Sequence, residues 1–288
     1  GIIDVDEQKE VIFGNDVTLD DVIWMGPQPS IREQAAEVGV EHTAPFAELA
    51  AMVKKLIDSG RPIHFLPPYR AENKILLETL TGIKPDEQTS KASVELIKAV
   101  VSLRSVKEPQ EIQEMESAME TAWLMHTTAM RMAKPGVYER EIAGVVEGIA
   151  LSSGGRLSFP IILTVHGETL HNHYHGHKLK AGDLLLTDTG TESPMHYATD
   201  HTRTVPVGGK FTGQQKDIYE IVLDAQIQAI KAMKPGIPFR DVHFLAASVI
   251  GHGLKDLGLM KGDIETAVKL GAHALFMPHG LGHMMGLD

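Results

Sequence analysis

Hydrophobic residues follow both strand-like and helix-like spacings in the first part of the chain. Ile2, Ile3 and Val5 precede a polar turn and another apolar run follows it, which is typical of a β-hairpin. Apolar residues then recur at helical spacing up to Gly60, a residue type that often follows the end of a helix. The predicted elements are a hairpin over residues 1–13, a helix over 45–59, a buried strand over 63–66, and helices over 71–80 and 94–103.

A polar stretch that ends at Pro109 predicts a domain boundary, because proline suits the first turn of a new helix. Beyond it, long helical patterns flank a β-rich stretch. The predicted elements are helices over 109–133, 138–152, 212–233 and 239–254, and strands over 159–165, 184–188 and 195–207. The pattern therefore predicts an α/β (α+β) protein with two domains, over residues 1–104 and 105–288.

Two of the predicted helix–helix connections share a short sequence. Lys134-Pro-Gly and Lys234-Pro-Gly each follow one predicted helix and precede another. Repeats that build solenoids are shorter and more numerous. Two long copies instead indicate one domain with internal pseudo-twofold symmetry, in which two helix pairs are related to each other.

The composition indicates a folded chain and argues against some classes of binding partner. Hydrophobic residues make up 43% of the 288 residues, so a packed core is expected. The net charge of −11 argues against nucleic acid, because phosphate binding requires a basic face. No apolar run is long enough to predict a transmembrane helix. The chain has no cysteine, which excludes disulfides, thiolate catalysis and cysteine-ligated zinc and fits a reducing compartment.

Three motifs each offer a ligand of the kind that divalent ions prefer. Asp188 ends an apolar run, Asp200 precedes His-Thr-Arg, and His283 ends the segment His279-Gly-Leu-Gly-His283. Asp188 and Asp200 are expected on neighbouring antiparallel strands. Burying one carboxylate unpaired costs on the order of several kcal/mol, and a second one nearby adds repulsion. A divalent cation would relieve both costs, so the three motifs predict a metal site.

The other histidines leave two interpretations open. His171, His173, His175 and His177 alternate along the sequence, so on a strand they would line one face. They could form a metal-binding cluster, or a solvated hairpin tip from which one histidine reaches the site. Around His279, the neighbouring glycines disfavour a helix, and an extended or bent segment is predicted.

These motifs resemble those of the Xaa-Pro aminopeptidase and prolidase family, the proline-directed branch of the pita-bread metallopeptidases. The family signature is His, small, aliphatic, small, His, any residue, aliphatic, Gly, aliphatic. The segment His279-Gly-Leu-Gly-His283-Met-Met-Gly-Leu follows it, except that Met285 replaces Val, Leu or Ile. The resemblance covers residues 105–288, and residues 1–104 resemble the rear part of the family's N-terminal domain. It implies a pita-bread catalytic domain with internal pseudo-twofold symmetry, preceded by part of a smaller α/β domain.

The resemblance also implies a set of metal ligands. By position, Asp188 would chelate one metal ion, Asp200 would bridge two, and His283 would bind the second. Thr202 and Arg203 would lie behind the ligands and orient them.

The same comparison by position implies residues that act on the substrate. His171 would lie near the substrate, with His173 as the alternative, and His279 would contact the scissile carbonyl. The family has two further glutamate ligands and another histidine, which are expected beyond Asp288. The chain is therefore expected to be truncated at both ends and inactive as given.

The implied activity is metal-dependent hydrolysis of the Xaa-Pro bond, which releases the N-terminal residue of peptides with proline second by means of a metal-bridging hydroxide. The implied cofactors are two divalent ions, Mn²⁺ first, with Zn²⁺ or Co²⁺ as alternatives. The expected partners are such peptides and further copies of the chain in a homodimer or larger oligomer. No nucleic acid or membrane partner is expected, and the expected location is the cytoplasm.

Three other functions compete with this one. A prolidase of the same fold would cleave only dipeptides, and a relative without metal would bind partners instead of cleaving them. The run Leu-Leu-Leu-Thr-Asp188-Thr-Gly also resembles an aspartic protease motif. Such proteases need a second copy of that motif, which this sequence lacks, and the motif leaves Asp200 and His283 unexplained.

Overall fold

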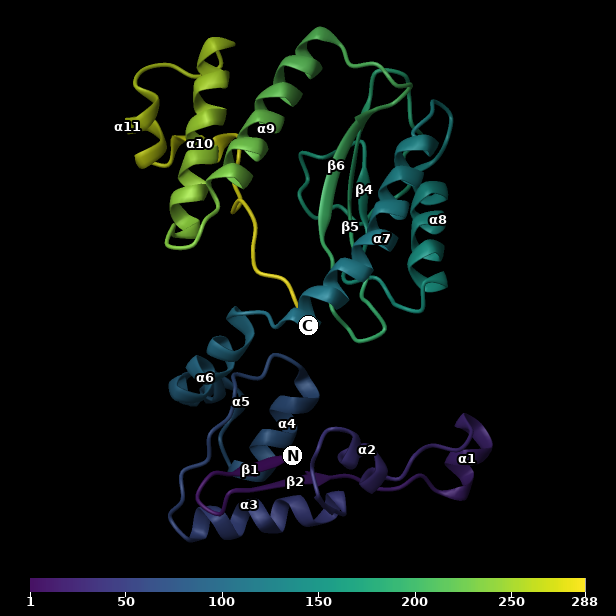
Figure 1. The fold of residues 1–288 in the computed structure, drawn as a ribbon, viewed down its shortest axis with the longest axis vertical. Helices are drawn as coiled ribbons and strands as arrows, with labels where there is room; N and C mark the ends of the chain where they lie inside the picture. Colours follow the sequence, from purple (N-terminus) through teal and green to yellow (C-terminus); the bar gives the residue numbers. More distant parts are fainter. Residues whose placement is uncertain (288) are drawn as a thin grey trace. The chain divides into compact units, whose positions relative to one another are not determined.

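The structure, a computed structural model, describes residues 1–287 and divides the chain into two compact units, Gly1–Arg104 and Ser105–Asp288. In the part of the chain that it describes, every helix is too short or too polar to cross a bilayer. Figure 1 shows the elements of each unit with the labels used below.

The N-terminal unit joins a small mixed sheet to several helices. Strand β1 pairs antiparallel with β2, with Ile2 opposite Val11, and β2 pairs parallel with β3. This confirms the predicted hairpin. The strands and helices of this unit are β1 Ile2–Asp4, β2 Lys9–Phe13, α1 Leu19–Met25, α2 Ile31–Glu37, β3 His42–Ala44, η1 Phe46–Glu48, α3 Leu49–Asp58, α4 Ala71–Thr81, α5 Pro85–Lys91 and α6 Val94–Ser105.

The predicted strand over residues 63–66 is wrong. In the structure this segment is irregular and bonds to the start of α6: Phe65 accepts a hydrogen bond from the backbone of Ser93, and the His64 ring lies 2.7 Å from the Ser93 hydroxyl. Prolines on both sides lack the N–H that a sheet ladder needs. An apolar sequence alone was therefore not sufficient to predict a strand here.

A buried ion pair fixes the end of β1. Both guanidinium nitrogens of Arg61 donate to the carboxylate of Asp4, at 2.7 and 2.5 Å, and the Asp4 side chain is 7% exposed. The hydrogen bonds from Arg61 lower the pKa of Asp4 from 3.8 to about 2. This carboxylate therefore stays charged at neutral and mildly acidic pH.

In the C-terminal unit, helices α7 (Pro109–Met132) and α8 (Glu139–Ser152) pack together against a three-stranded antiparallel sheet (Figure 1). The sheet order is β4 (Ile162–Thr164), β5 (Leu184–Thr189), β6 (His201–Pro206), so β5 is the central strand. The core between helices and sheet contains large side chains that are wholly buried: Met125, Ile142, Val146, Leu163 and Leu185. The site residues on β5 thus stand on a rigid support.

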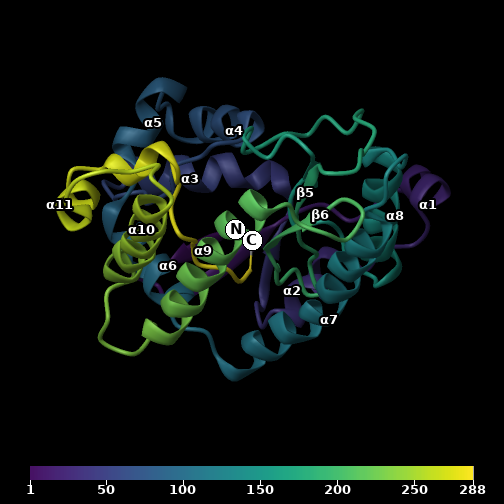
Figure 2. The same cartoon turned by 90° about the horizontal axis from the view of Figure 1, so that it is seen from above.

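A second helix group follows the sheet. Figure 2 shows α10 (Phe239–Asp256) between α9 (Gly213–Ala232) and α11 (Ile264–Lys269), and the short η2 (Ala272–Leu275) ends the group. The two Lys-Pro-Gly connections adopt the same turn, since Gly136 and Gly236 both have a positive φ, of 95° and 86°. The connection between α9 and α10 thus has the same form as the connection between α7 and α8, as the repeated Lys-Pro-Gly sequence predicted.

The loop between β5 and β6 is held by buried hydroxyl and backbone groups. Thr199 is fully buried, and its backbone N–H and its hydroxyl both donate to the carbonyl of Thr191, at 2.9 and 3.1 Å. Ser158 donates from its hydroxyl to the carbonyl of Thr199 at 2.7 Å. A Cβ atom on Gly190 would collide with the backbone oxygen of Thr199 and the Ser158 hydroxyl. Only glycine therefore allows this close approach.

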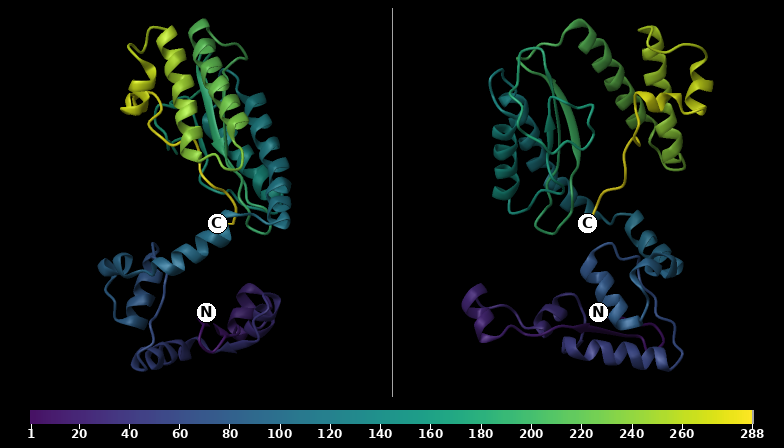
Figure 3. Two further views of the ribbon diagram at one scale, coloured as in Figure 1. Left: turned by 60° about the vertical axis from the view of Figure 1, so that its left-hand side comes forward. Right: turned by 180° about the vertical axis from the view of Figure 1, so that it is seen from behind.

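The last described segment leaves the helices and returns to the sheet. Figure 3 shows it running extended from the α9–α11 group toward the start of α7. There the backbone N–H of Ala198 donates to the carbonyl of Gly286 at 3.0 Å, and Tyr197 forms an isolated bridge with Leu287. The segment is therefore tied to the same loop that joins β5 to β6.

Replacing Gly190 with alanine should destabilise the C-terminal unit by about 1–3 kcal/mol, because the added methyl meets backbone that cannot move aside. Gly144→Ala is the control: it lies on the exposed face of α8 with no atom near its Cβ, and alanine there should stabilise by about 0.5–1 kcal/mol. Calorimetric unfolding of both variants tests the difference. Equal melting temperatures would show that the loop tolerates the methyl.

Stability at low pH should depend on the Asp4 pair. Its folded pKa lies below the unfolded value, so the stabilisation is fully present above the ordinary 3.8 and is lost as pH falls through about 2. An NMR titration of the Asp4 carboxyl carbon should give a midpoint near 2, and Arg61→Met should raise it. A wild-type midpoint near 3.8 would show that the pair does not form.

Candidate metal centre

Asp188 and Asp200 lie where β5 ends and β6 begins. Asp188 is opposite Thr202 in the ladder, and Asp200 immediately precedes the first residue of β6. Their carboxyl groups are within hydrogen-bond distance of each other, which requires a shared proton or a cation between them. The sequence placed both residues on adjacent antiparallel strands, and the structure brings them together.

Asp188 carries the signs of a carboxylate that lacks its natural partner. Burial, followed by the charge of Asp200, raises its pKa from 3.8 to about 6, and hydrogen bonding to Thr202 opposes part of this change. Its Oδ1 atom is buried without a hydrogen-bond partner among the described residues. A buried oxygen of this kind is costly unless it binds a cation.

His283 reaches the same point from the end of the described chain. Its Nε2 atom lies 3.0 Å from Oδ2 of Asp200, and its Nδ1 donates to the carbonyl of Met284 at 3.0 Å. The bond to Met284 raises the pKa of His283, and the Asp200 carboxylate raises it further. The imidazole nitrogen and the carboxylate oxygen therefore face each other at hydrogen-bond distance, at a position where both could instead bind a metal ion.

The donor set fits a divalent cation. Two carboxylates and an imidazole are ligands that Mn²⁺, Zn²⁺ or Co²⁺ accept, and the orphaned oxygen of Asp188 points to a missing positive charge. The described residues contain no group of three or more such side chains already spaced to hold an ion. The three residues form instead a chain of contacts, from Asp188 to Asp200 to His283.

Other predicted residues lie around this chain of contacts. His171 is exposed but near enough to Asp188 that its charge lowers the pKa of that carboxyl. Thr202 bonds to Asp188, whereas the exposed Arg203 donates to the backbone oxygen of Thr202 at 2.8 Å. Thr202 thus touches a candidate ligand, and Arg203 acts on the backbone that carries it.

His279 is not joined to the carboxylates by any hydrogen bond within residues 1–287. Its Nδ1 donates to the carbonyl of Gly280 at 2.8 Å, and it lies near His243, whose pKa is lowered by burial and by the neighbouring His273 and His279. No helix forms around His279 and His283, as the glycines predicted.

The alternating histidines do not form a strand. The rings of His173 and His175 face the backbone carbonyls of Ile161 and Leu163, at 3.3 and 3.0 Å. His177 bonds instead to the fully buried carboxylate of Glu139, at 2.9 Å. Two of these rings thus bond to backbone at or beside β4 and the third to a side chain of α8, and the described chain shows no metal-binding cluster there.

Two imidazoles behind the carboxylates were not among the residues predicted from the sequence motifs. His126 of α7 is 6% exposed and faces the partly buried His201 of β6 edge-on, with ring centroids 6.2 Å apart. Burial lowers the pKa of both imidazoles, which favours their neutral form. A signal was present in the sequence, because His126 is the one polar side chain among the buried positions of this helix.

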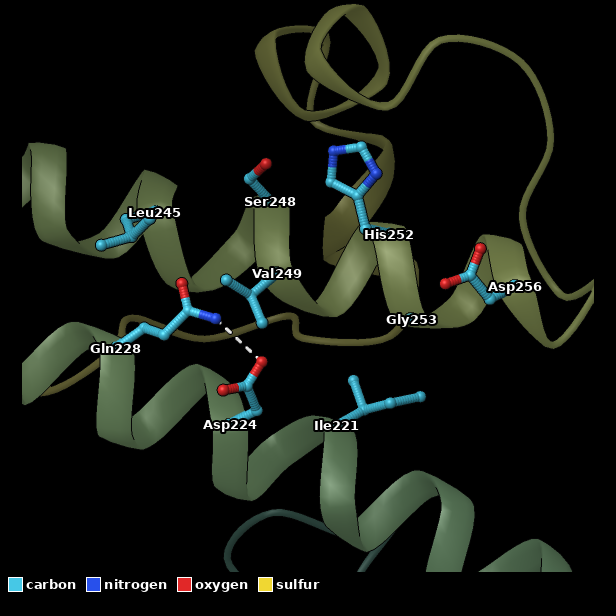
Figure 4. A pocket seen from close by; sticks show the side chains of 9 residues that line it. All are labelled: Ile221, Asp224, Gln228, Leu245, Ser248, Val249, His252, Gly253 and Asp256. Carbon is cyan, nitrogen blue, oxygen red and sulfur yellow. Dashed lines mark hydrogen bonds between the residues drawn. The ribbon is translucent and has the colours of Figure 1, made fainter.

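A hollow between α9 and α10 is the other candidate site. Figure 4 shows Asp224, Gln228, Ser248, His252 and Asp256 around it, with Gln228 bonded to Asp224. His252 is already engaged with Glu265, at 3.3 Å. None of the residues predicted from the sequence motifs lines this hollow, so the carboxylate pair is the better supported site.

Comparisons with known proteins identify the family to which the chain is similar. Residues 113–288 match the model of metallopeptidase family M24, and residues 1–64 match the aminopeptidase P N-terminal domain. The Xaa-Pro aminopeptidase of Escherichia coli is 30% identical over 96% of the chain, and a probable Xaa-Pro aminopeptidase of Uncinocarpus reesii is 31% identical over 99%. The chain spans 65% and 60% of the lengths of these two relatives.

Solved structures give the same fold. An aminopeptidase of Pseudomonas aeruginosa matches with a TM-score of 0.83 and 26% identity over 96% of this chain and 64% of its own. A zinc-substituted aminopeptidase P of E. coli with bound product matches with a TM-score of 0.83 and 28% identity, over 96% and 65%. The predicted pita-bread fold is confirmed. The family model covers more than half of the sequence and includes Asp188, Asp200 and His283, so the chain belongs to metallopeptidase family M24.

Proposed function

We propose that this chain forms the metal-binding part of an enzyme that hydrolyses the Xaa-Pro peptide bond and releases the N-terminal residue of peptides with proline second. The observation that carries the proposal is the contact chain from Asp188 through Asp200 to His283, in a chain of family M24. Relatives that align along nearly all of it are Xaa-Pro aminopeptidases, which supports this substrate class.

In this proposal Asp188, Asp200 and His283 would hold two divalent ions. Bound ions of this kind lower the pKa of water and polarise a carbonyl group. Thr202 holds the Asp188 carboxylate by a hydrogen bond, and Arg203 fixes the backbone of Thr202. Because Asp188 is half-buried, bulk water competes less with a metal ion for its carboxylate.

The two remaining histidines are assigned to the substrate. His171 is exposed beside Asp188, where it can contact a bound peptide. His279 uses its Nδ1 proton on Gly280, so Nε2 is the ring nitrogen that can face a scissile carbonyl. An Xaa-Pro bond suits such a site, because its nitrogen has no proton to be gripped and recognition must come from the carbonyl side.

We further propose Mn²⁺ as the native metal, because the oxygen-rich ligands suit it, although Zn²⁺ and Co²⁺ fit the same donors. A homodimer or larger assembly is proposed from the family resemblance, and light scattering tests it. The absence of cysteine supports a reducing compartment such as the cytoplasm.

The activity is tested with the chain together with any residues that extend it in the natural protein. The protein is mixed with Mn²⁺ and equal amounts of Ala-Pro, Arg-Pro-Pro, Met-Ala-Ser and Ala-Ala-Ala, with and without EDTA, and products are identified by mass spectrometry. We expect loss of Arg from Arg-Pro-Pro, abolished by EDTA, because the candidate ligands need a divalent ion.

Each other outcome of this experiment selects a competing function. Cleavage of Ala-Pro alone would make the enzyme a prolidase. Cleavage of Met-Ala-Ser or Ala-Ala-Ala at equal rates would contradict the proline specificity. No cleavage of any peptide, with no metal bound, would favour a partner-binding protein.

Asp188→Asn should weaken Mn²⁺ binding by at least about 10–100-fold, the loss caused by removing even an outer partner of a metal ligand. Asp217→Asn removes an exposed carboxylate of α9 and serves as the charge-matched control. Isothermal titration calorimetry at neutral pH measures both. Unchanged affinity in Asp188→Asn would rule this residue out as a ligand.

A further inference from the structure

His126 contacts the two strands that carry the candidate metal ligands. Its Nε2 lies 3.3 Å from the carbonyl oxygen of Thr189, and its ring faces the His201 ring edge-on, with centroids 6.2 Å apart. Thr189 and His201 are paired across the β5–β6 ladder. One side chain from α7 therefore spans both strands at the last pair of the ladder.

That pair is next to both carboxylates. Thr189 directly follows Asp188, and His201 directly follows Asp200. The regular ladder ends here, and beyond it the hydrogen bonds between Thr199 and Thr191 hold the loop. The like charges of Asp188 and Asp200 favour separation of the strand ends, and a side chain of α7 that contacts both strands adds a constraint from the helix side.

The contact also defines how the ring is protonated. A carbonyl oxygen only accepts hydrogen bonds, so Nε2 carries the proton that is donated to Thr189. Nδ1 is then the bare ring nitrogen, and it is buried. The side chain thus acts as a neutral donor and adds no positive charge beside the carboxylates.

A packing role alone does not account for a histidine at this position. The other buried positions of α7 are Ala118, Ala122, Met125 and Ala129, all apolar or nearly so. A leucine would fill similar space without burying a polar ring, which costs free energy unless the ring bonds to specific partners. The polar ring therefore marks a contact that the helix makes with the strands.

We infer that His126 is a positioning residue, which helps to set the separation of Asp188 and Asp200 by contacting the residue beside each of them, Thr189 through its backbone and His201 through its ring. The inference rests on the proposed metal site, since it concerns how the ligands are held for the ions. His126 touches neither substrate nor metal in this arrangement and acts through Thr189 and His201.

The test compares three variants with wild type by calorimetric titration of Mn²⁺ into the protein, including any natural extension of the chain. His126→Leu keeps the volume but removes the donor, and should weaken Mn²⁺ binding about 10–100-fold. His126→Gln retains an N–H at a similar reach and should restore affinity close to wild type. Met125→Ala opens a cavity in the core between α7 and the sheet without removing a hydrogen-bond donor, and should lower the melting temperature without changing Mn²⁺ affinity.

The outcomes distinguish failure of the proposed metal site from failure of the positioning role of His126. If wild type binds no Mn²⁺, the proposed metal site fails, whatever the variants do. If wild type binds and His126→Leu binds equally well, or His126→Gln is as weak as His126→Leu, the positioning role is overturned. A loss in Met125→Ala equal to that in His126→Leu would also overturn it, because general loosening of the core would then explain the effect.

Two measurements keep the test decisive if His126→Leu does not fold. His126→Asn has an amide too short to reach Thr189, and it should bind Mn²⁺ more weakly than His126→Gln. In wild type, ¹⁵N NMR of the imidazole should show a neutral ring with the proton on Nε2. A ring protonated on Nδ1 alone would contradict the bond to Thr189 and with it the inference.

Discussion

The repulsion between the carboxylates of Asp188 and Asp200 is the constraint on which the C-terminal unit depends. Two like charges at hydrogen-bond distance are unfavourable in a half-buried place, so the surrounding structure must hold them there. Central strand β5 gives Asp188 neighbours on both sides. The loop to β6 is closed by Thr199 and Gly190, which leaves Asp200 little freedom to move away.

The third candidate ligand depends on the same loop. His283 is remote in sequence, and its segment is tied down by Ala198 and Tyr197, which lie between the two carboxylates in the chain. One short stretch thus spaces Asp188 from Asp200 and also brings His283 to Asp200. A change in this loop would therefore displace Asp188, Asp200 and His283 together, although Asp188 lies on β5 and His283 lies on the extended last segment.

The sequence was informative where structure follows from local pattern. The long helices, the Lys-Pro-Gly turns and the two aspartates on adjacent strands all come from periodicity or chemistry within a few residues. The strand predicted over residues 63–66 is wrong because a strand needs a partner strand, and an apolar sequence does not reveal whether one exists. His126 was overlooked for a similar reason: its place in an apolar stripe describes the helix, whereas its role comes from strands far along the chain.

Two buried carboxylates in this chain show why the site calls for an outside cation. Asp4 is bonded to Arg61, and its pKa falls to about 2. Asp188 forms no ion pair with lysine or arginine among residues 1–287, and its pKa rises to about 6. The hydroxyl of Thr202 beside it is neutral, while Arg203 donates to a backbone oxygen instead. A built-in cation would have satisfied Asp188 as Arg61 satisfies Asp4. Its absence leaves a negative charge that a divalent ion can balance, and this is the property that a metallopeptidase site requires.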